Sequence, residues 1–197
     1  MSFDDYSKVG TELLKNAHYW EAIAQFQLAL QEKPTSSQTW NNLGFAFSGL
    51  GAYSQAIVAH KKALDIDPKF AAAWYSLGWV YEQINCYKEA LASYKVAVNL
   101  NPKSATIWCN LGGVYCQLKN YAEALASYKC AVQIDPYYAR VWNNIGWVAQ
   151  QLNEINQAIA AYKTALQIDP NYIHAQNNLT ELQTQLKQKQ KITPIIQ

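Results

Sequence analysis

The chain repeats one pattern of apolar, small and polar positions every 34 residues. In the first half of each period, a large apolar residue is followed three positions later by an aliphatic residue and then by glycine. In the second half, an alanine is followed four positions later by a ring and three positions further by a second alanine. Such spacings put residues on one face of an α-helix, so each period is predicted to form two helices.

The same residue types recur in register in all five periods. The large apolar column is Tyr6, Trp40, Trp74, Trp108 and Trp142; the glycine column is Gly10, Gly44, Gly78, Gly112 and Gly146; the ring column is Phe26, His60, Tyr94, Tyr128 and Tyr162. Small residues let two helices approach closely, and large side chains fill the space beside the contact. Each period is therefore predicted to be a helical hairpin, and sheet structure has no place in the pattern.

Proline and turn residues mark the ends of these helices. Five of the six prolines lie 34 residues apart, at Pro34, Pro68, Pro102, Pro136 and Pro170. Each is expected to end a second helix, because the residue before a proline disfavours the helical conformation. Gly51, Asn85 and Asn153 fall in the turn inside a hairpin, where we expect positive φ. A fixed period of this length indicates stacked hairpins.

The pattern W-x2-L-G-x2-[YF], followed by A-x3-[FY]-x2-A and P, resembles the tetratricopeptide repeat (TPR) family. The resemblance covers residues 3–172, and all five units carry the glycine, both alanines and the proline. The first unit departs most, with Tyr6 and Val9 in place of Trp and Leu, and the fifth has Ala149 at an aromatic position. The resemblance implies an all-α fold, a right-handed α-α superhelix of the TPR solenoid type.

We expect residues 1–191 to form a single TPR domain. Its repeats are residues 3–36, 37–70, 71–104, 105–138 and 139–172. Residues 173–191 keep the first-helix register but turn to Gln and Lys, as expected of a capping helix whose outer face is solvated. Residues 192–197, which contain Pro194, are expected to form a flexible tail.

The charge content narrows the choice of partners. Sixteen Lys and Arg residues against fourteen Asp and Glu residues leave a net charge of +2, and only 15% of the residues are charged. This balance gives no strong field for phosphate backbones or anionic lipid, so nucleic acid is not expected as a partner. A related helical repeat family reads RNA base by base, but its groove is basic and this one is not.

The residues at the start of the sequence, the lengths of its apolar runs and its cysteine spacing lead us to expect a cytoplasmic protein. No run approaches the roughly 18 apolar residues of a membrane span, so membrane insertion is not expected. The acidic start lacks the basic and apolar segments of a secretion signal. Four cysteines without a CxxC spacing are expected to be reduced thiols.

No catalytic or metal-binding constellation emerges from the sequence. His18, His60 and His174 share no face, and His60 replaces an aromatic residue in the buried ring column, as a core histidine would. Cys109 and Cys116 lie about 10.5 Å apart along one helix, too far for a disulfide and without partners for zinc. We therefore expect no enzyme activity, no cofactor and no metal.

In the TPR family the first helices line the concave side of the stack. Positions that the hairpin core does not use are expected to face this groove: the second, fifth, sixth, ninth, twelfth and thirteenth of each repeat. The sixth position holds Asn42, Asn110, Asn144 and, in the capping helix, Asn178. Because an Asn amide both donates and accepts hydrogen bonds, these side chains could pair with an extended peptide backbone.

The resemblance at these asparagines is closest to superhelical TPR arrays, such as that of the O-linked N-acetylglucosamine transferases, whose concave asparagines hold peptide backbone. Lys8 and Ser76 interrupt the series in this chain. Asn before Leu-Gly is also common in the family. The alternative is therefore that these amides make only hydrogen bonds between repeats.

Large aromatic residues depart from a polar groove. Phe45, Trp79 and Trp147 occupy the ninth position of their repeats, and Tyr75 occupies the fifth. The hairpin core does not require them, and exposed aromatic side chains are the usual energetic centres of interfaces. The alternative is that Trp79 and Trp147 pack against the side of the next repeat.

Charged groove positions are few. Arg140, close to Asn143 and Asn144, is the basic residue expected there, to fix a carboxylate or to pair with a neighbouring acid, and Glu82 is the acid. Chaperone-binding TPR proteins grip a C-terminal carboxylate with Lys, Asn and Arg, and of the corresponding positions only Asn42 matches. A neutral and partly apolar partner is therefore predicted.

The sequence thus predicts a non-enzymatic adaptor that binds a peptide segment of a partner protein in its concave groove. The asparagines would hold the peptide backbone, and the aromatic residues would select its side chains. The alternative is a self-associating scaffold, including a homo-oligomer, or an assembly factor that uses its ends or its convex face.

Overall fold

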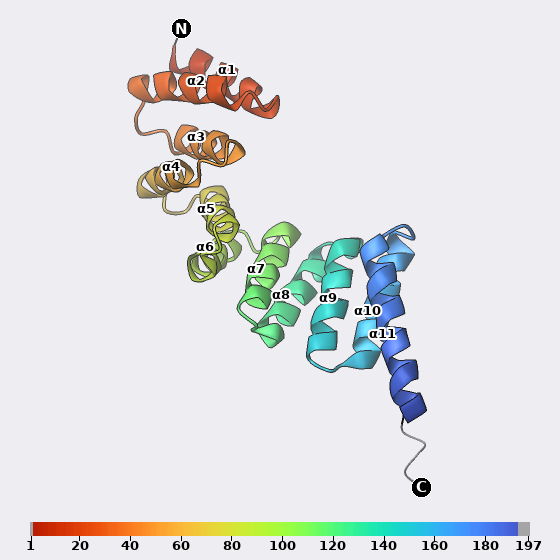
Figure 1. The fold of residues 1–197 in the computed structure, drawn as a ribbon. Coiled ribbons are helices and arrows are strands. Elements are labelled where there is room, and N and C mark those ends of the chain that lie inside the picture. The colour runs from red at the N-terminus through yellow and green to blue at the C-terminus, as the bar shows by residue number, and fades with distance from the viewer. Residues whose placement is uncertain (1, 193–197) are drawn as a thin grey trace. The chain divides into compact units, whose positions relative to one another are not determined.

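The computed structural model describes residues 2–192, which form eleven α-helices and no strand (Figure 1). The chain divides into two compact units, Met1–Pro102 and Lys103–Gln197. The helices of the first unit are α1 (Phe3–Lys15), α2 (Tyr19–Glu32), α3 (Ser37–Gly49), α4 (Tyr53–Ile66), α5 (Ala71–Gln83) and α6 (Tyr87–Leu100). Those of the second are α7 (Ala105–Gln117), α8 (Tyr121–Ile134), α9 (Ala139–Gln151), α10 (Ile155–Ile168) and α11 (Ile173–Ile192).

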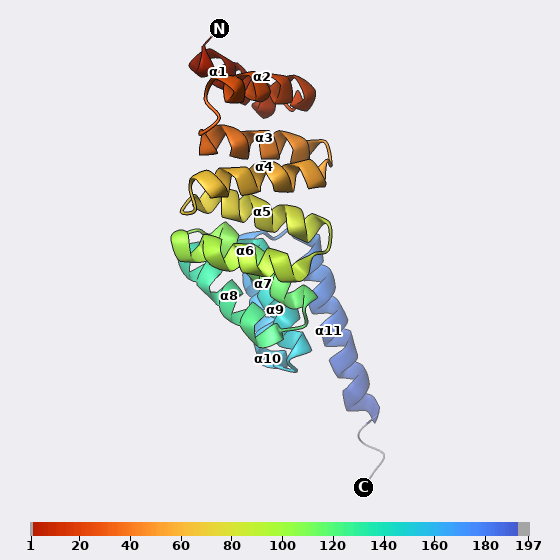
Figure 2. The same cartoon turned by 90° about the vertical axis from the view of Figure 1, so that its left-hand side faces the viewer.

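Each predicted repeat is one helical hairpin. Within the first unit, α2 also packs on α3 and α4 on α5, and the first helices contact one another in the order α1, α3, α5 (Figure 2). Within the second unit, α8 packs on α9, and α11 packs on both α10 and α9. The all-α fold class predicted from the sequence is confirmed.

The glycine and ring columns meet inside every hairpin. A Cβ atom built on Gly44 would lie 2.5 Å from Cε1 of His60, and one built on Gly78 would lie 2.8 Å from Cδ1 of Tyr94. Both distances are shorter than any real Cβ contact. The ring therefore lies directly on the backbone of the first helix, and His60 is the fully buried core residue that its column predicted.

The turn inside each hairpin contains one residue with positive φ. These residues are Ala17, Gly51, Asn85, Lys119 and Asn153, with φ between 59° and 72°. The predictions for Gly51, Asn85 and Asn153 are confirmed. Ala17 and Lys119 adopt the same conformation because each ends its helix in the same way: the next N–H donates to a carbonyl five residues back, as His18 N does to Leu13 O at 2.9 Å.

The large apolar column links consecutive repeats as well as filling space. Trp40, Trp74 and Trp142 each donate their indole N–H to the carbonyl of the proline that closes the preceding repeat, at 2.8 Å in every case. Gln176 makes the same bond from α11, to Pro170 O at 2.7 Å. In α3, α5, α9 and α11 this side chain thereby fixes the loop that leads into the helix.

The capping helix covers the end of the second unit. Ala175 and Leu182 of α11 are buried, and Leu182 packs with Ala158 and Tyr162 of α10. The helix runs from Ile173 to Ile192, and the predicted domain bounds stay a prediction. Residues 193–197 of the predicted tail lie outside the described residues.

Two adjacent glycines of α7 allow a matched test of the ring contact. A Cβ on Gly112 would lie 2.6 Å from Cε1 of Tyr128, whereas one on Gly113 would meet nothing closer than the Tyr128 hydroxyl at 3.8 Å. Gly112→Ala should therefore lower the free energy of unfolding by about 1–3 kcal/mol. Gly113→Ala should raise it by about 0.5–1 kcal/mol through helix propensity. Urea denaturation of both variants checks this, and equal effects would contradict it.

Candidate functional site

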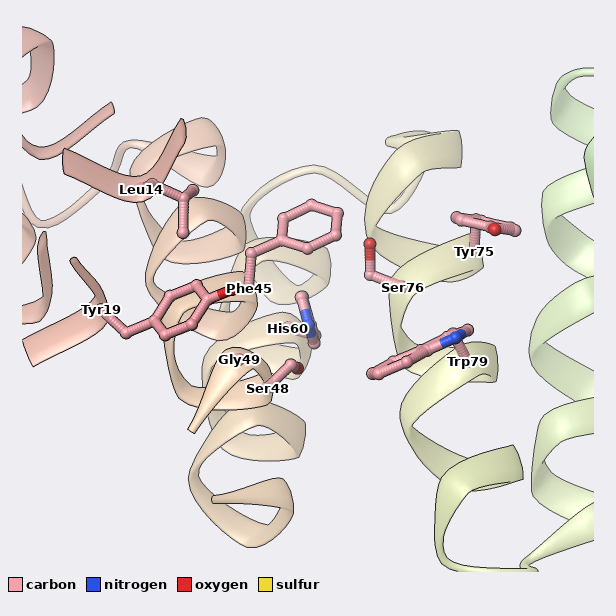
Figure 3. A pocket seen from close by; sticks show the side chains of 9 residues that line it. All are labelled: Leu14, Tyr19, Phe45, Ser48, Gly49, His60, Tyr75, Ser76 and Trp79. Atoms are coloured by element: carbon pink, nitrogen blue, oxygen red, sulfur yellow. The ribbon is translucent and has the colours of Figure 1, made fainter. Parts of the chain in front are cut away.

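The groove positions of the first unit enclose a pocket of about 380 Å³. Its apolar walls come from α1, α2, α3 and α5: Leu14, Tyr19, Phe45, Tyr75 and Trp79 (Figure 3). Ser48, His60 and Ser76 add polar atoms to the lining. Three of the predicted groove residues, Phe45, Tyr75 and Trp79, thus lie around one space.

Ring contacts hold these aromatic side chains in place. Phe45, 41% exposed, meets the His60 ring edge to face at a centroid distance of 5.7 Å. Trp79 meets Tyr53 in the same manner at 6.4 Å, and the rings of Tyr75 and Tyr94 lie 5.8 Å apart. Such contacts orient the rings before any ligand arrives.

Trp147 of the second unit has a similar setting. Its side chain is 38% exposed and meets Tyr121 edge to face at 5.9 Å. Tyr53 and Tyr121 begin the second helices of the repeats that precede Trp79 and Trp147. The ring contacts of both tryptophans are thus with the preceding repeat, and packing on the next repeat stays a prediction.

His60 forms the buried floor of the pocket. Its Nδ1 lies 2.9 Å from Oδ1 of Asn41, and because an amide oxygen only accepts, we assign the proton to Nδ1. Nε2 is then an acceptor, and this buried atom has no hydrogen-bond partner. Burial lowers the pKa of His60 to about 4, so the imidazole is neutral near pH 7.

The predicted asparagines divide between two environments. Asn42 accepts from Gln38 Nε2 at 2.8 Å and donates to Thr11 Oγ1 of the preceding repeat at 3.5 Å. Asn178 donates to Oδ1 of Asn143 at 2.9 Å, again across repeats. Both amides therefore make the inter-repeat bonds that the alternative described, and binding of a peptide backbone by them stays a prediction.

The fifth position faces inward more than the sequence suggested. Asn143 is only 7% exposed, and Asn41 and Cys109 at the same position of other repeats are buried as well. The sixth-position residues Asn110 and Asn144 are half-buried, and Asn144 bonds Tyr128. The sixth and ninth positions are thus the more accessible part of this face.

Each of the two charged groove residues has a tyrosine partner. Arg140 Nη2 donates to the hydroxyl of Tyr138 at 2.6 Å, and its guanidinium carbon lies 5.4 Å from the centre of the Tyr138 ring. Glu82 accepts from the Tyr94 hydroxyl at 2.9 Å. Arg140 is thus engaged by a tyrosine rather than by the neighbouring acid that was expected as an alternative.

The described residues offer little for catalysis. In residues 2–192 no three His, Cys, Asp or Glu side chains lie together as metal ligands would. Burial raises the pKa of the Cys116 thiol, which keeps it protonated and a poor nucleophile. None of the described helices combines the length and the apolar character needed to cross a membrane.

Stacked hairpins with a shared face of first helices define an α-helical repeat protein. Models described as tetratricopeptide repeat match residues 103–171, 37–70 and 61–92, and one described as TPR repeat matches residues 83–118. The chain belongs to the tetratricopeptide repeat family. The resemblance on which the expected fold rested is therefore confirmed.

Solved structures share this fold. MamA is 25% identical, with a TM-score of 0.78 over 82% of this chain and 95% of that one. MamA from residue 41 to its end, from Desulfovibrio magneticus RS-1, is 20% identical, with a TM-score of 0.80 over 86% and 96%. YrrB, described as a TPR protein with an unusual peptide-binding site, is 22% identical, with a TM-score of 0.77 over 87% and 89%. The comparison with curated proteins gives no match.

Several residues of the pocket were not among the predicted site residues. Leu14, Tyr19 and Ser48 line it together with His60, which had been interpreted only as a core residue. The signal was present in the sequence, since His60 is the imidazole in a column of benzene rings. The effect of this substitution on the pocket depends on the facing side chain of the first helix, Ser48, which the ring column alone does not show.

The lowered pKa of His60 predicts acid sensitivity. The folded state keeps the imidazole neutral down to about pH 4, whereas the unfolded chain takes up a proton below about pH 6.5. The unfolded state then binds more protons in this window, so stability is lost as the pH falls. Relative to His60→Phe, the wild type should lose about 3 kcal/mol of unfolding free energy between pH 7 and pH 4. Urea denaturation at several pH values measures the difference, and parallel profiles would contradict it.

Proposed function

We propose that this TPR protein is an interaction module that binds a peptide segment of a partner protein on its groove face. The observation that supports this most directly is the pocket lined by Phe45, Tyr75 and Trp79. Concave, mostly apolar sites with a few polar groups are the usual form of ligand-binding surfaces. Pre-oriented rings also lose little conformational entropy on binding.

In the second unit, we assign the corresponding role to Trp147 with Asn110 and Asn144. Trp147 offers a partly exposed ring supported by Tyr121. The neighbouring amides could add hydrogen bonds to a peptide backbone. Each amide has two donors and an acceptor oxygen, so the bond of Asn144 to Tyr128 leaves it further capacity. We give Asn143 and Asn178, which bond each other, a supporting role.

The partner should be neutral and partly apolar. Arg140 and Glu82, the charged groove residues, already have tyrosine partners. Binding would then depend on aromatic contact and hydrogen bonds more than on charge, and should change little with salt. The four free cysteines suit a reducing compartment such as the cytoplasm. YrrB shows that this fold is able to carry a peptide site, although a shared fold does not transfer a function.

Self-association is the second candidate, and exposed rings outside the groove positions support it. Trp20 on α2 is 71% exposed and Tyr137, just before α9, is 81% exposed. A scaffold that uses such surfaces would leave the groove empty. Sedimentation over a range of protein concentrations would reveal an oligomer, and a change of mass on Trp20→Ala or Tyr137→Ala would assign it to these surfaces.

The double variant Trp79→Ala, Trp147→Ala tests the groove proposal. In affinity capture from a lysate of the source organism, this variant should recover at least about tenfold less of the partner than the wild type, because it lacks two interface anchors. Trp20→Ala, Tyr137→Ala is the matched control, since it removes two exposed rings outside the groove and should keep the partner. Circular dichroism confirms that both variants are folded. Loss with the control variant, or full capture by the groove variant, would move the function to another surface.

A further inference from the structure

Three hairpins share a side-chain contact that the second repeat lacks. In the third and fifth repeats, the phenol of the ring column reaches the twelfth position of the first helix: Tyr94 donates to Glu82 at 2.9 Å and Tyr162 to Gln150 at 3.1 Å. In the fourth repeat, the Tyr128 hydroxyl lies 3.7 Å from Cys116 Sγ. The phenol oxygen therefore closes the space between the two helices.

In the second repeat the same two positions hold His60 and Ser48. An imidazole is shorter than a phenol and serine is a small side chain, so the two do not meet. Ser48 Oγ instead donates to Gly44 O at 2.9 Å. The pocket lies beside this pair, with His60 between Phe45 and Ser48, across from Trp79 (Figure 3). His60 exposes no surface to the pocket, so a ligand reaches the imidazole only when a neighbouring side chain turns aside.

The polar atoms of this space need a hydrogen-bond donor. Nε2 of His60 is a buried acceptor without a partner. The hydroxyl of Ser48 already donates to Gly44 O, and that of Ser76 donates to Ala72 O at 2.7 Å. A buried acceptor left without a donor is costly, so a ligand that supplies one gains affinity there.

We propose that this pocket binds a tyrosine side chain of the partner peptide, whose phenol hydroxyl donates to Nε2 of His60 once the Phe45 side chain, which stands against the imidazole, turns aside. The ring would lie among Phe45, Tyr75 and Trp79, whose edges and faces suit aromatic contact. The proposal rests on the proposed peptide-binding function and names the side chain that anchors the peptide.

Other side chains fit this chemistry less well. Phe, Leu and Met supply no donor, and Ser or Thr is too short to fill the pocket from the groove. A lysine ammonium would be desolvated among rings beside a neutral imidazole. The indole N–H of Trp lies at the side of its ring. The phenol O–H of Tyr lies at the far end of its ring, where it can meet an acceptor on the floor of the pocket, such as Nε2 of His60.

The test uses two soluble compounds that differ by one hydroxyl, N-acetyltyrosine amide and N-acetylphenylalanine amide, each titrated against the full chain by NMR. The tyrosine compound should bind about tenfold more tightly, which corresponds to one net hydrogen bond. The ¹⁵N resonance of His60 Nε2 should move on its addition and not on addition of the phenylalanine compound. Equal binding of the two, or an unmoved resonance, would overturn the proposal.

Three variants distinguish the contribution of the Nε2 acceptor from that of the space beside His60. His60→Phe keeps a ring, as Phe26 does in the first repeat, but removes the acceptor, so the tenfold preference should vanish. Ser48→Leu fills the space from the other helix and should weaken binding of the tyrosine compound at least about tenfold. Tyr162→Phe, at the same column in the fifth repeat, is the control and should change nothing. A preference that persists in His60→Phe would overturn the proposal.

These results are distinguishable from failure of the proposed function. If Trp79→Ala, Trp147→Ala loses the partner while His60→Phe and Ser48→Leu capture it fully, the tyrosine proposal fails and groove binding stands. If the tyrosine compound binds at His60 as expected but the groove variant captures the partner fully, peptide binding by the groove fails and the pocket stands.

Discussion

The contact between a glycine of the first helix and a ring of the second is the constraint on which each hairpin depends. With no Cβ at Gly10, Gly44, Gly78, Gly112 or Gly146, the facing ring lies against the helix backbone, closer than any other residue would permit. This contact sets the separation of the two helices and directs the end of the ring toward the twelfth position. A phenol oxygen at that end meets the twelfth position in the third, fourth and fifth repeats, whereas His60 of the second has none and the pocket lies beside it.

A polar bond adds to the apolar packing between consecutive repeats. An indole N–H from each of three first helices binds the carbonyl of the preceding proline, and Gln176 makes the same bond at the start of α11. A proline carbonyl at a helix end has no intrahelical donor, so the bond satisfies a group that would otherwise need water. Because it fixes where each first helix begins, it also fixes the positions of the ninth-position rings within a unit.

Much of this architecture was predictable, because it depends on single columns. Glycine, alanine and proline at fixed spacing gave the hairpins, and Gly51, Asn85 and Asn153 gave their turns. The positive φ of Ala17 and Lys119 was not predicted, because it comes from the hydrogen bonds that end the helix and not from a conformational preference of these residue types. Asn143 was expected in the groove, but the fifth position lies nearer the core. The pocket depends on two columns read together across the hairpin, His60 with Ser48, and on rings from neighbouring helices, so no single spacing reveals it.

A repeated surface has a problem of register, because a peptide shifted by one repeat meets nearly the same residues. The asparagines cannot solve it, since they recur, and Asn42 and Asn178 are engaged between repeats. A residue that departs from its column in one repeat can solve it, as His60 does in the ring column. His60 and Ser48 replace a closed pair at one place in the series, so a side chain that requires the space and the acceptor fits the first unit in one register. The low overall charge also helps to fix the register. A weak electrostatic field gives little non-specific attraction, so complexes in which the peptide is shifted by one repeat gain little from it.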